Sequence, residues 1–242
     1  HAYGGVAAAV EAALSPATRL VMFTDLHNPS GVALDDGDVD ALTELAGRRD
    51  LWLACDETFR DAGERPTGTL ASRSPRWVTT STFTKSYGLG SLRIGWAAGP
   101  PAALAAAAAV QDALSVEPAG PSLELALALL PHLDGLRVRG RALLAANHER
   151  WRAAVAGLPC DAGVASRGTT TFVHFPGPAA GDAFTAFAAE RFGLCVVPGR
   201  FFGEPRGARI ALGGEPGALA AALDIFQGAV RAFARETAGE PA

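Results

Sequence analysis

The heptapeptide TFTKSYG, residues 82–88, contains Lys85, the only lysine among the 21 lysine and arginine residues of this chain. A coding bias towards arginine explains that ratio, but it does not explain where the one lysine stands. Where arginine replaces lysine freely, a retained lysine indicates a site that needs a neutral, nucleophilic amine, because a guanidinium group keeps its charge. The heptapeptide is therefore the first candidate for chemistry in this chain.

The sequence around the heptapeptide alternates between strands and helices. Apolar, β-prone runs occur at 18–24, 51–55, 77–83 and 94–98, and an amphipathic helical pattern capped by Asp35 or Asp36 extends to about residue 49. Strands that are continuously apolar and alternate with helices are typical of buried parallel sheets. The pattern predicts an α/β fold in which helices sandwich a mostly parallel sheet.

The second half of the chain has a different character. From residue 101 to about 157 the pattern is helical, with interruptions at 118–121 and near Pro131, and a long helix is expected over 140–156. Beyond Pro159, short strands and helices alternate over 169–233. We therefore expect two domains, a large one over 1–150 and a small α+β domain over 151–242.

The composition excludes several classes of protein. The chain is 49% hydrophobic and 19% charged with a net charge of −4, as expected for a cytoplasmic globular protein without a basic surface for nucleic acid or anionic lipid. The apolar run at 102–110 is too short to span a membrane. The three cysteines, Cys55, Cys160 and Cys195, are far apart, so neither a disulfide framework nor a metal site is expected.

Polar residues follow three of the predicted strands at their carboxyl ends. Asn28 follows the first strand, Asp56 ends the second, and Lys85 follows the third, with Arg93 eight residues further on. In open α/β sheets, ligands bind beyond the carboxyl ends of the strands. One such residue would be an ordinary turn former, but three in succession indicate a binding site.

These residues stand in motifs that match a known family. The segments HNPSG (27–31), DETF (56–59) and TFTK (82–85) resemble the class I/II aminotransferases of pyridoxal-phosphate (PLP) fold type I, as do the residues that follow the lysine, Gly88, Gly90, Arg93 and Gly95. Three later dipeptides resemble motifs in the C-terminal domain of these aminotransferases: Pro198-Gly199, Phe202-Gly203 and Arg209-Ile210. The resemblance extends from about residue 4 to 235.

The resemblance implies a role for each motif residue. Lys85 would form the Schiff base with PLP and shuttle a proton, and Asp56 would keep the pyridine nitrogen protonated. Asn28 would donate a hydrogen bond to the ring oxygen. Arg93, Thr82 and Thr84 would hold the phosphate, and Arg209 would bind the substrate carboxylate in a bidentate pair beside Asn28.

The chain departs from the family pattern in two places. Phe59 stands where the family usually has a tyrosine whose hydroxyl assists the ring oxygen. The family's N-terminal phosphate loop and ring-stacking aromatic residue have no counterpart before Asn28. We therefore expect the chain to be an N-terminally truncated piece of a longer enzyme.

The resemblance implies transamination between an amino acid and a 2-oxo acid in a cytoplasmic homodimer. Two alternatives stay open, because fold does not fix reaction. One is a PLP-dependent lyase, decarboxylase or cyclase on the same scaffold. The other is a non-catalytic PLP-binding regulator domain, although no helix-turn-helix pattern occurs in these residues.

Overall fold

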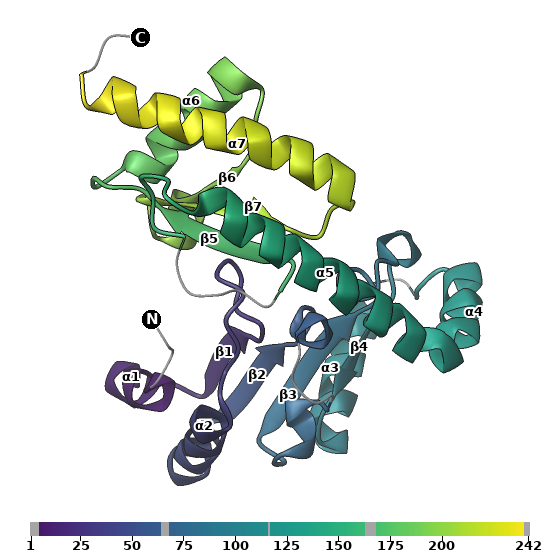
Figure 1. Cartoon of the computed structure of the whole chain (residues 1–242). Coiled ribbons are helices and arrows are strands. Elements are labelled where there is room, and N and C mark those ends of the chain that lie inside the picture. The colour runs from purple at the N-terminus through teal and green to yellow at the C-terminus, as the bar shows by residue number, and fades with distance from the viewer. Residues whose placement is uncertain (1–4, 64–67, 116, 163–167, 240–242) are drawn as a thin grey trace. The chain divides into compact units, whose positions relative to one another are not determined.

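The computed structural model describes residues 5–63, 68–115, 117–162 and 168–239, which form two compact units (Figure 1). One unit comprises Val32–Gly140 and the chain up to His27. The other comprises Asn28–Gly31 and the chain from Arg141 onwards. The division falls within helix α5 (Leu133–Val155). The domain boundary that we placed near residue 150 stays a prediction.

The first unit is built on a four-stranded sheet of order β1-β2-β3-β4. Its strands are β1 (Leu20–Thr24), β2 (Trp52–Asp56), β3 (Trp77–Thr82) and β4 (Gly95–Ala98). The first three run parallel, with Thr24 opposite Asp56 and Asp56 opposite Thr80, and β4 is antiparallel to β3. The α/β fold with a mostly parallel sheet is therefore confirmed, and three strands end at one edge, as the predicted site requires.

One face of this sheet packs on helix α2 (Asp36–Arg49). Leu42, Leu53 and Trp77 are at most 1% exposed in this core. The Asp35 carboxylate caps α2 by accepting a hydrogen bond of 2.7 Å from the Asp38 backbone N–H. Because side chains alternate along a strand, the opposite face carries Asp56 and Thr82. It also carries Leu20 and Met22, which are 47% and 74% exposed.

The remaining helical elements of this unit are short or largely exposed. Helix α4 contributes Ala126 to a small buried cluster with Phe83, Tyr87 and Ile94, and this cluster lies beneath the Lys85 turn. The elements are α1 (Val6–Ala13), η1 (Arg60–Ala62), η2 (Leu70–Ser72), η3 (Gly90–Leu92), α3 (Pro101–Leu114), α4 (Gly120–Leu129) and η4 (Leu130–His132).

The long helix begins earlier than the sequence pattern predicts. We expected it over 140–156, but α5 begins at Leu133, directly after the turn that contains Pro131. Gly140, the first residue of the expected range, lies inside α5. A Cβ atom at this position would meet the Ser86 carbonyl oxygen at 3.0 Å. The glycine therefore permits a close approach to the heptapeptide and does not mark a helix end.

The second unit is a three-stranded antiparallel sheet of order β5-β7-β6 packed on helices. Its aromatic core includes Phe175 and Phe184, whose rings stack with centroids 4.3 Å apart. We expected one of the short strands of this region at 194–197, but strand β6 contains only Val197 and Pro198. The elements are β5 (Thr170–His174), α6 (Ala180–Phe192), β6 (Val197–Pro198), η5 (Gly199–Phe202), β7 (Gly207–Ala211) and α7 (Pro216–Thr237).

Helix α7 is long and apolar enough to cross a membrane, judged by its length and composition alone. However, Leu219, Leu223, Phe226 and Val230 recur at helical spacing and are buried in the aromatic core of this unit. These four residues therefore belong to the core of this unit.

Candidate active site

Asp56 is the last residue of β2, and Lys85 lies on the turn that follows the adjacent strand β3. A hydrogen bond joins the turns that follow the two strands. The Asp56 Oδ1 atom accepts a hydrogen bond of 2.9 Å from the Thr58 backbone N–H, which fixes the carboxylate in an Asx-type turn. The Ser86 hydroxyl donates to the Thr58 carbonyl oxygen at 3.0 Å. Ser86 is buried, whereas its neighbour Lys85 is exposed. The turn is thus fastened at its buried residues and leaves the lysine amine accessible.

Thr82, Thr84 and Arg93 gather at the end of β3. The Thr82 hydroxyl donates to the Ile94 carbonyl oxygen at 2.8 Å, and the hydroxyl oxygens of Thr82 and Thr84 lie 2.9 Å apart. Since Ile94 is the neighbour of Arg93 in the chain, these bonds place the three residues around one turn. Both threonine hydroxyls are already engaged there. Thr84 would therefore have to rotate its hydroxyl to donate to a phosphate.

Arg93 has two properties that suit an anion-binding residue. Its backbone is left-handed, with φ 54° and ψ 33°, which is uncommon for a residue with a Cβ atom. Its side chain is exposed, and its hydrogen bond to the Gly90 carbonyl oxygen is long at 3.5 Å. Among the described residues no carboxylate pairs with it. The guanidinium group can therefore accept an anionic partner.

Arg209 and Asn28 lie together in the second unit. Arg209 lies in the central strand β7, where its Nη1 atom donates to the Asn28 Oδ1 atom at 3.0 Å. The guanidinium carbon lies 5.2 Å from the centroid of the Phe202 ring, a cation–π contact. No Asp or Glu of the described chain forms an ion pair with Arg209. The Arg209 guanidinium group is thus held in place, and no carboxylate of the described residues neutralises its charge.

The structure brings the predicted site residues together in two groups. Asp56, Thr82, Thr84, Lys85 and Arg93 lie around the carboxyl ends of β2 and β3, and Asn28 lies with Arg209. The roles given to these residues stay predictions. The sequence pattern gave no role to Phe202, although it stands in the quoted Phe-Gly motif. Its contact with Arg209 depends on how η5 packs against β7, which the sequence alone does not show.

Phe59 follows Asp56 by three residues and lies on the same turn. It is half-buried and belongs to none of the buried hydrophobic clusters. Phe59 is therefore not a core residue whose ring is fully enclosed.

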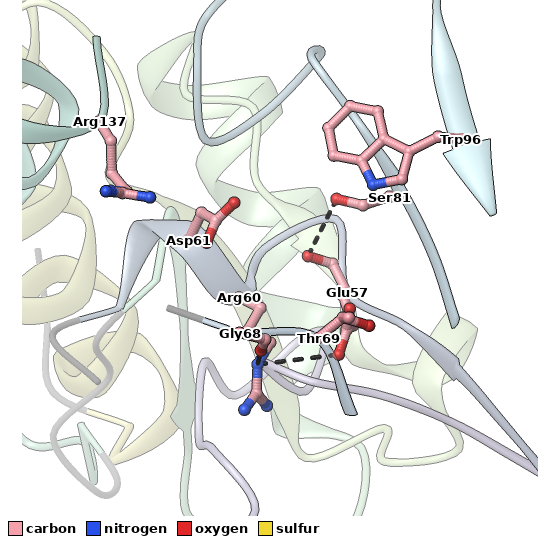
Figure 2. Close-up of a pocket in the computed structure, with 8 residues that line it drawn as sticks. All are labelled: Glu57, Arg60, Asp61, Gly68, Thr69, Ser81, Trp96 and Arg137. Carbon is pink, nitrogen blue, oxygen red and sulfur yellow. Dashed lines mark hydrogen bonds and ion pairs between the residues drawn. The ribbon is translucent and has the colours of Figure 1, made fainter. Parts of the chain in front are cut away.

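A cavity of about 190 Å³ opens on the face of the four-stranded sheet that is opposite to Asp56 and Thr82 (Figure 2). Ser81 and Trp96, which are opposite each other in β3 and β4, line it together with Glu57, Arg60, Asp61 and Arg137. None of the predicted site residues lines this cavity. Its charged groups are engaged with one another or with the chain. For example, Asp61 accepts a hydrogen bond from the Tyr87 hydroxyl at 2.5 Å.

Curated relatives include enzymes that act on amino acids. Capreomycidine synthase of Streptomyces vinaceus is 30% identical over 208 residues, which cover 83% of this chain and 53% of that protein. An aromatic amino acid aminotransferase of Rhodococcus jostii is 31% identical, with 85% of this chain and 54% of that protein covered. The chain thus spans about half the length of the curated relatives it matches.

Solved structures of aminotransferases share the fold. The aspartate aminotransferase of Rhizobium meliloti superposes with a TM-score of 0.82 at 27% identity, covering 93% of this chain and 61% of that one. A PLP-dependent cyclase, OrfR, superposes with a TM-score of 0.83 at 25% identity, covering 94% and 62%. The family model for aminotransferase class I and II matches residues 4–226. This chain therefore belongs to the class I and II aminotransferase family.

Proposed function

We propose that this protein is a PLP-dependent aminotransferase that moves an amino group from an amino acid to a 2-oxo acid. The observation that carries the proposal is Arg209, a guanidinium group fixed by Asn28 and Phe202 and not paired with any carboxylate of the described chain. Amino acids and 2-oxo acids share a carboxylate that such a group can bind with two parallel hydrogen bonds. Family membership and relatives named as aminotransferases support the same reaction.

The donor set of the first unit fits PLP. Lys85 provides an accessible amine and Asp56 a carboxylate for the pyridine nitrogen. Arg93, which pairs with no carboxylate of the described residues, provides a cation for the phosphate, assisted by Thr82 and Thr84. PLP supplies an electron sink beside the substrate's α-carbon. Lys85 would hold the cofactor covalently and carry the proton to and from that carbon, and Asp56 would hold a proton on the ring nitrogen.

Asn28 is oriented for its proposed role. Its Oδ1 atom accepts the hydrogen bond from Arg209, so its amide presents Nδ2 as the donor. A donor is what the charged ring oxygen of the cofactor requires. One residue would thus orient the substrate-binding arginine and contact the cofactor.

A second candidate function is a PLP-dependent cyclisation of an amino acid. It is favoured by the similarity to the cyclase OrfR and to a synthase, both of which cover most of this chain. The two functions differ in their products. An aminotransferase consumes a 2-oxo acid and releases another, whereas a cyclase needs no amino acceptor.

The proposal also covers the location, the oligomeric state and the partners of the enzyme. We propose a cytoplasmic protein of amino-acid metabolism that acts as a homodimer, with small-molecule substrates and with no nucleic acid or membrane as a partner. Closed two-fold symmetry is the commonest arrangement among soluble oligomers.

Arg209 supplies the test of the proposed function. With a panel of amino donors and 2-oxo acids, the full-length protein should form a new amino acid only when both substrates are present. Arg209→Lys should raise the KM for the best donor by about 10- to 100-fold, because one ammonium group cannot form the bidentate pair, and a charge-assisted hydrogen bond contributes about 1.5–3 kcal/mol. Arg206→Lys is a matched control, because Arg206 is exposed and pairs with Glu204. Product formation without a 2-oxo acid would instead support the cyclase.

Phe59 allows a second test. Phe59→Tyr should add a donor to the cofactor ring oxygen and so stabilise its charged form. A charge-assisted hydrogen bond contributes about 1.5–3 kcal/mol, and about 1.4 kcal/mol corresponds to one pKa unit. The midpoint of the pH-dependent absorbance change of the cofactor-loaded protein should therefore fall by about one to two units. An unchanged midpoint with a lower melting temperature would mean that the hydroxyl is buried without a partner.

A further inference from the structure

A second hydrogen bond ties the Lys85 turn to the segment that follows β2. The Tyr87 hydroxyl donates to the Asp61 Oδ2 atom at 2.5 Å, in addition to the bond from Ser86 to the Thr58 carbonyl oxygen. Tyr87 follows Lys85 by two residues in the chain and is 9% exposed. The two residues that follow the lysine are thus both bonded to the segment 58–61, and they hold the turn beside the end of β2.

The ring of Tyr87 holds the turn on the protein but does not by itself fix where the turn lies. It packs in the buried cluster beneath the turn, edge-on to Phe83 with ring centroids 5.8 Å apart. The Leu89 N–H closes the turn by donating to the Phe83 carbonyl oxygen at 3.0 Å. Apolar packing has no preferred direction, whereas a hydrogen bond depends on angle and distance. The hydroxyl therefore adds the directional contact that fixes the position of the turn along the sheet.

Asp61 lies in η1, which is itself anchored on two sides. The guanidinium group of Arg60 donates to the Asp25 Oδ2 atom, and its Nε atom donates to the Gly68 carbonyl oxygen at 3.0 Å. These bonds hold η1 to the chain before and after it. The acceptor of the Tyr87 hydroxyl thus belongs to an element whose own position is fixed.

The hydroxyl of Tyr87 keeps its proton at neutral pH. Burial raises the pKa of this hydroxyl, and so does its hydrogen bond to the Asp61 carboxylate. Asp61 lies in the wall of the cavity of Figure 2, which Arg137 also lines. Hydrogen bonds to an ionised acceptor are about twice as strong as those between neutral groups. The bond from Tyr87 to Asp61 therefore persists through neutral pH.

We propose that Tyr87 and Asp61 are positioning residues that hold Lys85 at the distance from Asp56 that proton transfer requires. This inference rests on the proposed function. All four residues belong to one compact unit. Tyr87 is buried and Lys85 is exposed, so Tyr87 acts through the backbone of the turn, and Asp61 acts through Tyr87. Displacing a reacting group by about 1 Å can slow a reaction by about 100-fold.

Removing the hydroxyl should lower turnover without weakening substrate binding. For full-length Tyr87→Phe with PLP bound, we expect kcat for the best amino donor to fall by about tenfold and KM to stay within about twofold. Arg209, which is proposed to bind the substrate carboxylate, is left unchanged. Ser81→Ala is the matched control and should turn over as wild type. Ser81 lines the same cavity, and its hydroxyl donates to the Glu57 carbonyl oxygen over a long distance of 3.4 Å.

Hydrogen exchange of the full-length protein without PLP measures the turn directly. The Leu89 N–H closes the turn, so its exchange rate reports how often the turn opens. In Tyr87→Phe the peptide 83–89 should exchange about five- to tenfold faster, as expected when one hydrogen bond is lost. Ser81→Ala should exchange as wild type. An equal exchange rate in Tyr87→Phe and wild type would overturn the inference.

Variants of Asp61 separate positioning from a loss of stability. In an Asp61→Ala background, Tyr87→Phe should have no further effect on kcat, because the two side chains act through one bond. Asp61→Asn keeps an acceptor oxygen for the hydroxyl and should recover most of the turnover that Asp61→Ala loses.

The outcomes distinguish the inference from the proposed function. Decreases in kcat that multiply in the double variant would overturn the inference, as would a Tyr87→Phe protein with a lower melting temperature and wild-type kcat. In both cases the wild type still transfers amino groups, so the proposed function stands. A wild-type protein that transfers no amino group from any donor of the panel would overturn the proposed function, and the inference with it.

Discussion

Replacing Lys85 with alanine should lower the rate of amino transfer by about 10²- to 10⁴-fold, the range expected when a positioned proton carrier is lost. The loss should be visible in single-turnover mixing with the amino donor. Lys85→Arg should be equally inactive although it keeps the positive charge, because a guanidinium group is neither nucleophilic nor readily deprotonated.

The wild-type protein provides the direct check on this assignment. Borohydride reduction followed by peptide mass mapping should place a cofactor adduct on Lys85, which is exposed in the turn after β3. The Lys85→Ala protein should carry no adduct on that peptide. An adduct found only on the N-terminal amine of the wild type would show that the lysine was wrongly assigned.

Asp56→Ala should damage turnover far more than it damages cofactor retention. Loss of a charge-assisted hydrogen bond of about 1.5–3 kcal/mol corresponds to a decrease in kcat of about one to two orders of magnitude. Cofactor affinity should change little, because the proposed contact of Arg93 with the phosphate does not depend on Asp56. Stopped-flow turnover and equilibrium PLP titration measure the two quantities separately.

The geometry of Asp56 adds a control to this experiment. Its Oδ1 atom also accepts the Thr58 backbone N–H, so the alanine variant loses a turn hydrogen bond together with the charge. Asp56→Asn keeps an acceptor for Thr58 and removes only the charge. If the asparagine variant turned over at the wild-type rate with its cofactor bound, the proposed contact with the ring nitrogen would be wrong.

The sequence was sufficient to place residues whose position follows from the end of a strand. Lys85 and Asp56 were located in this way, because apolar strands end where polar residues begin and parallel strands end at one edge of the sheet. The fold class followed from the same alternation. The predicted start of the long helix at residue 140 was wrong, because α5 begins at Leu133 and continues through Gly140, where the lack of a Cβ atom permits the close approach of Ser86.

Contacts between residues distant in the sequence could not be predicted. Asp25 and Arg60 are 35 residues apart, and each reads as an ordinary polar residue of a turn. Only the pairing of β1 with β2 brings them together. The contact of Phe202 with Arg209 likewise requires the fold of η5 against β7. Such pairs form only when separate elements pack against each other, and no local sequence pattern encodes that packing.

The left-handed backbone of Arg93 has a consequence for engineering this protein. An L-residue in this conformation costs roughly 1–2 kcal/mol, and glycine avoids most of that cost. A selection for thermal stability alone would therefore favour Arg93→Gly and discard the cation proposed to bind phosphate. Stability and function oppose each other at this one position. Screens for stable variants of this protein would need PLP present, so that cofactor binding selects for the arginine although its backbone conformation is unfavourable.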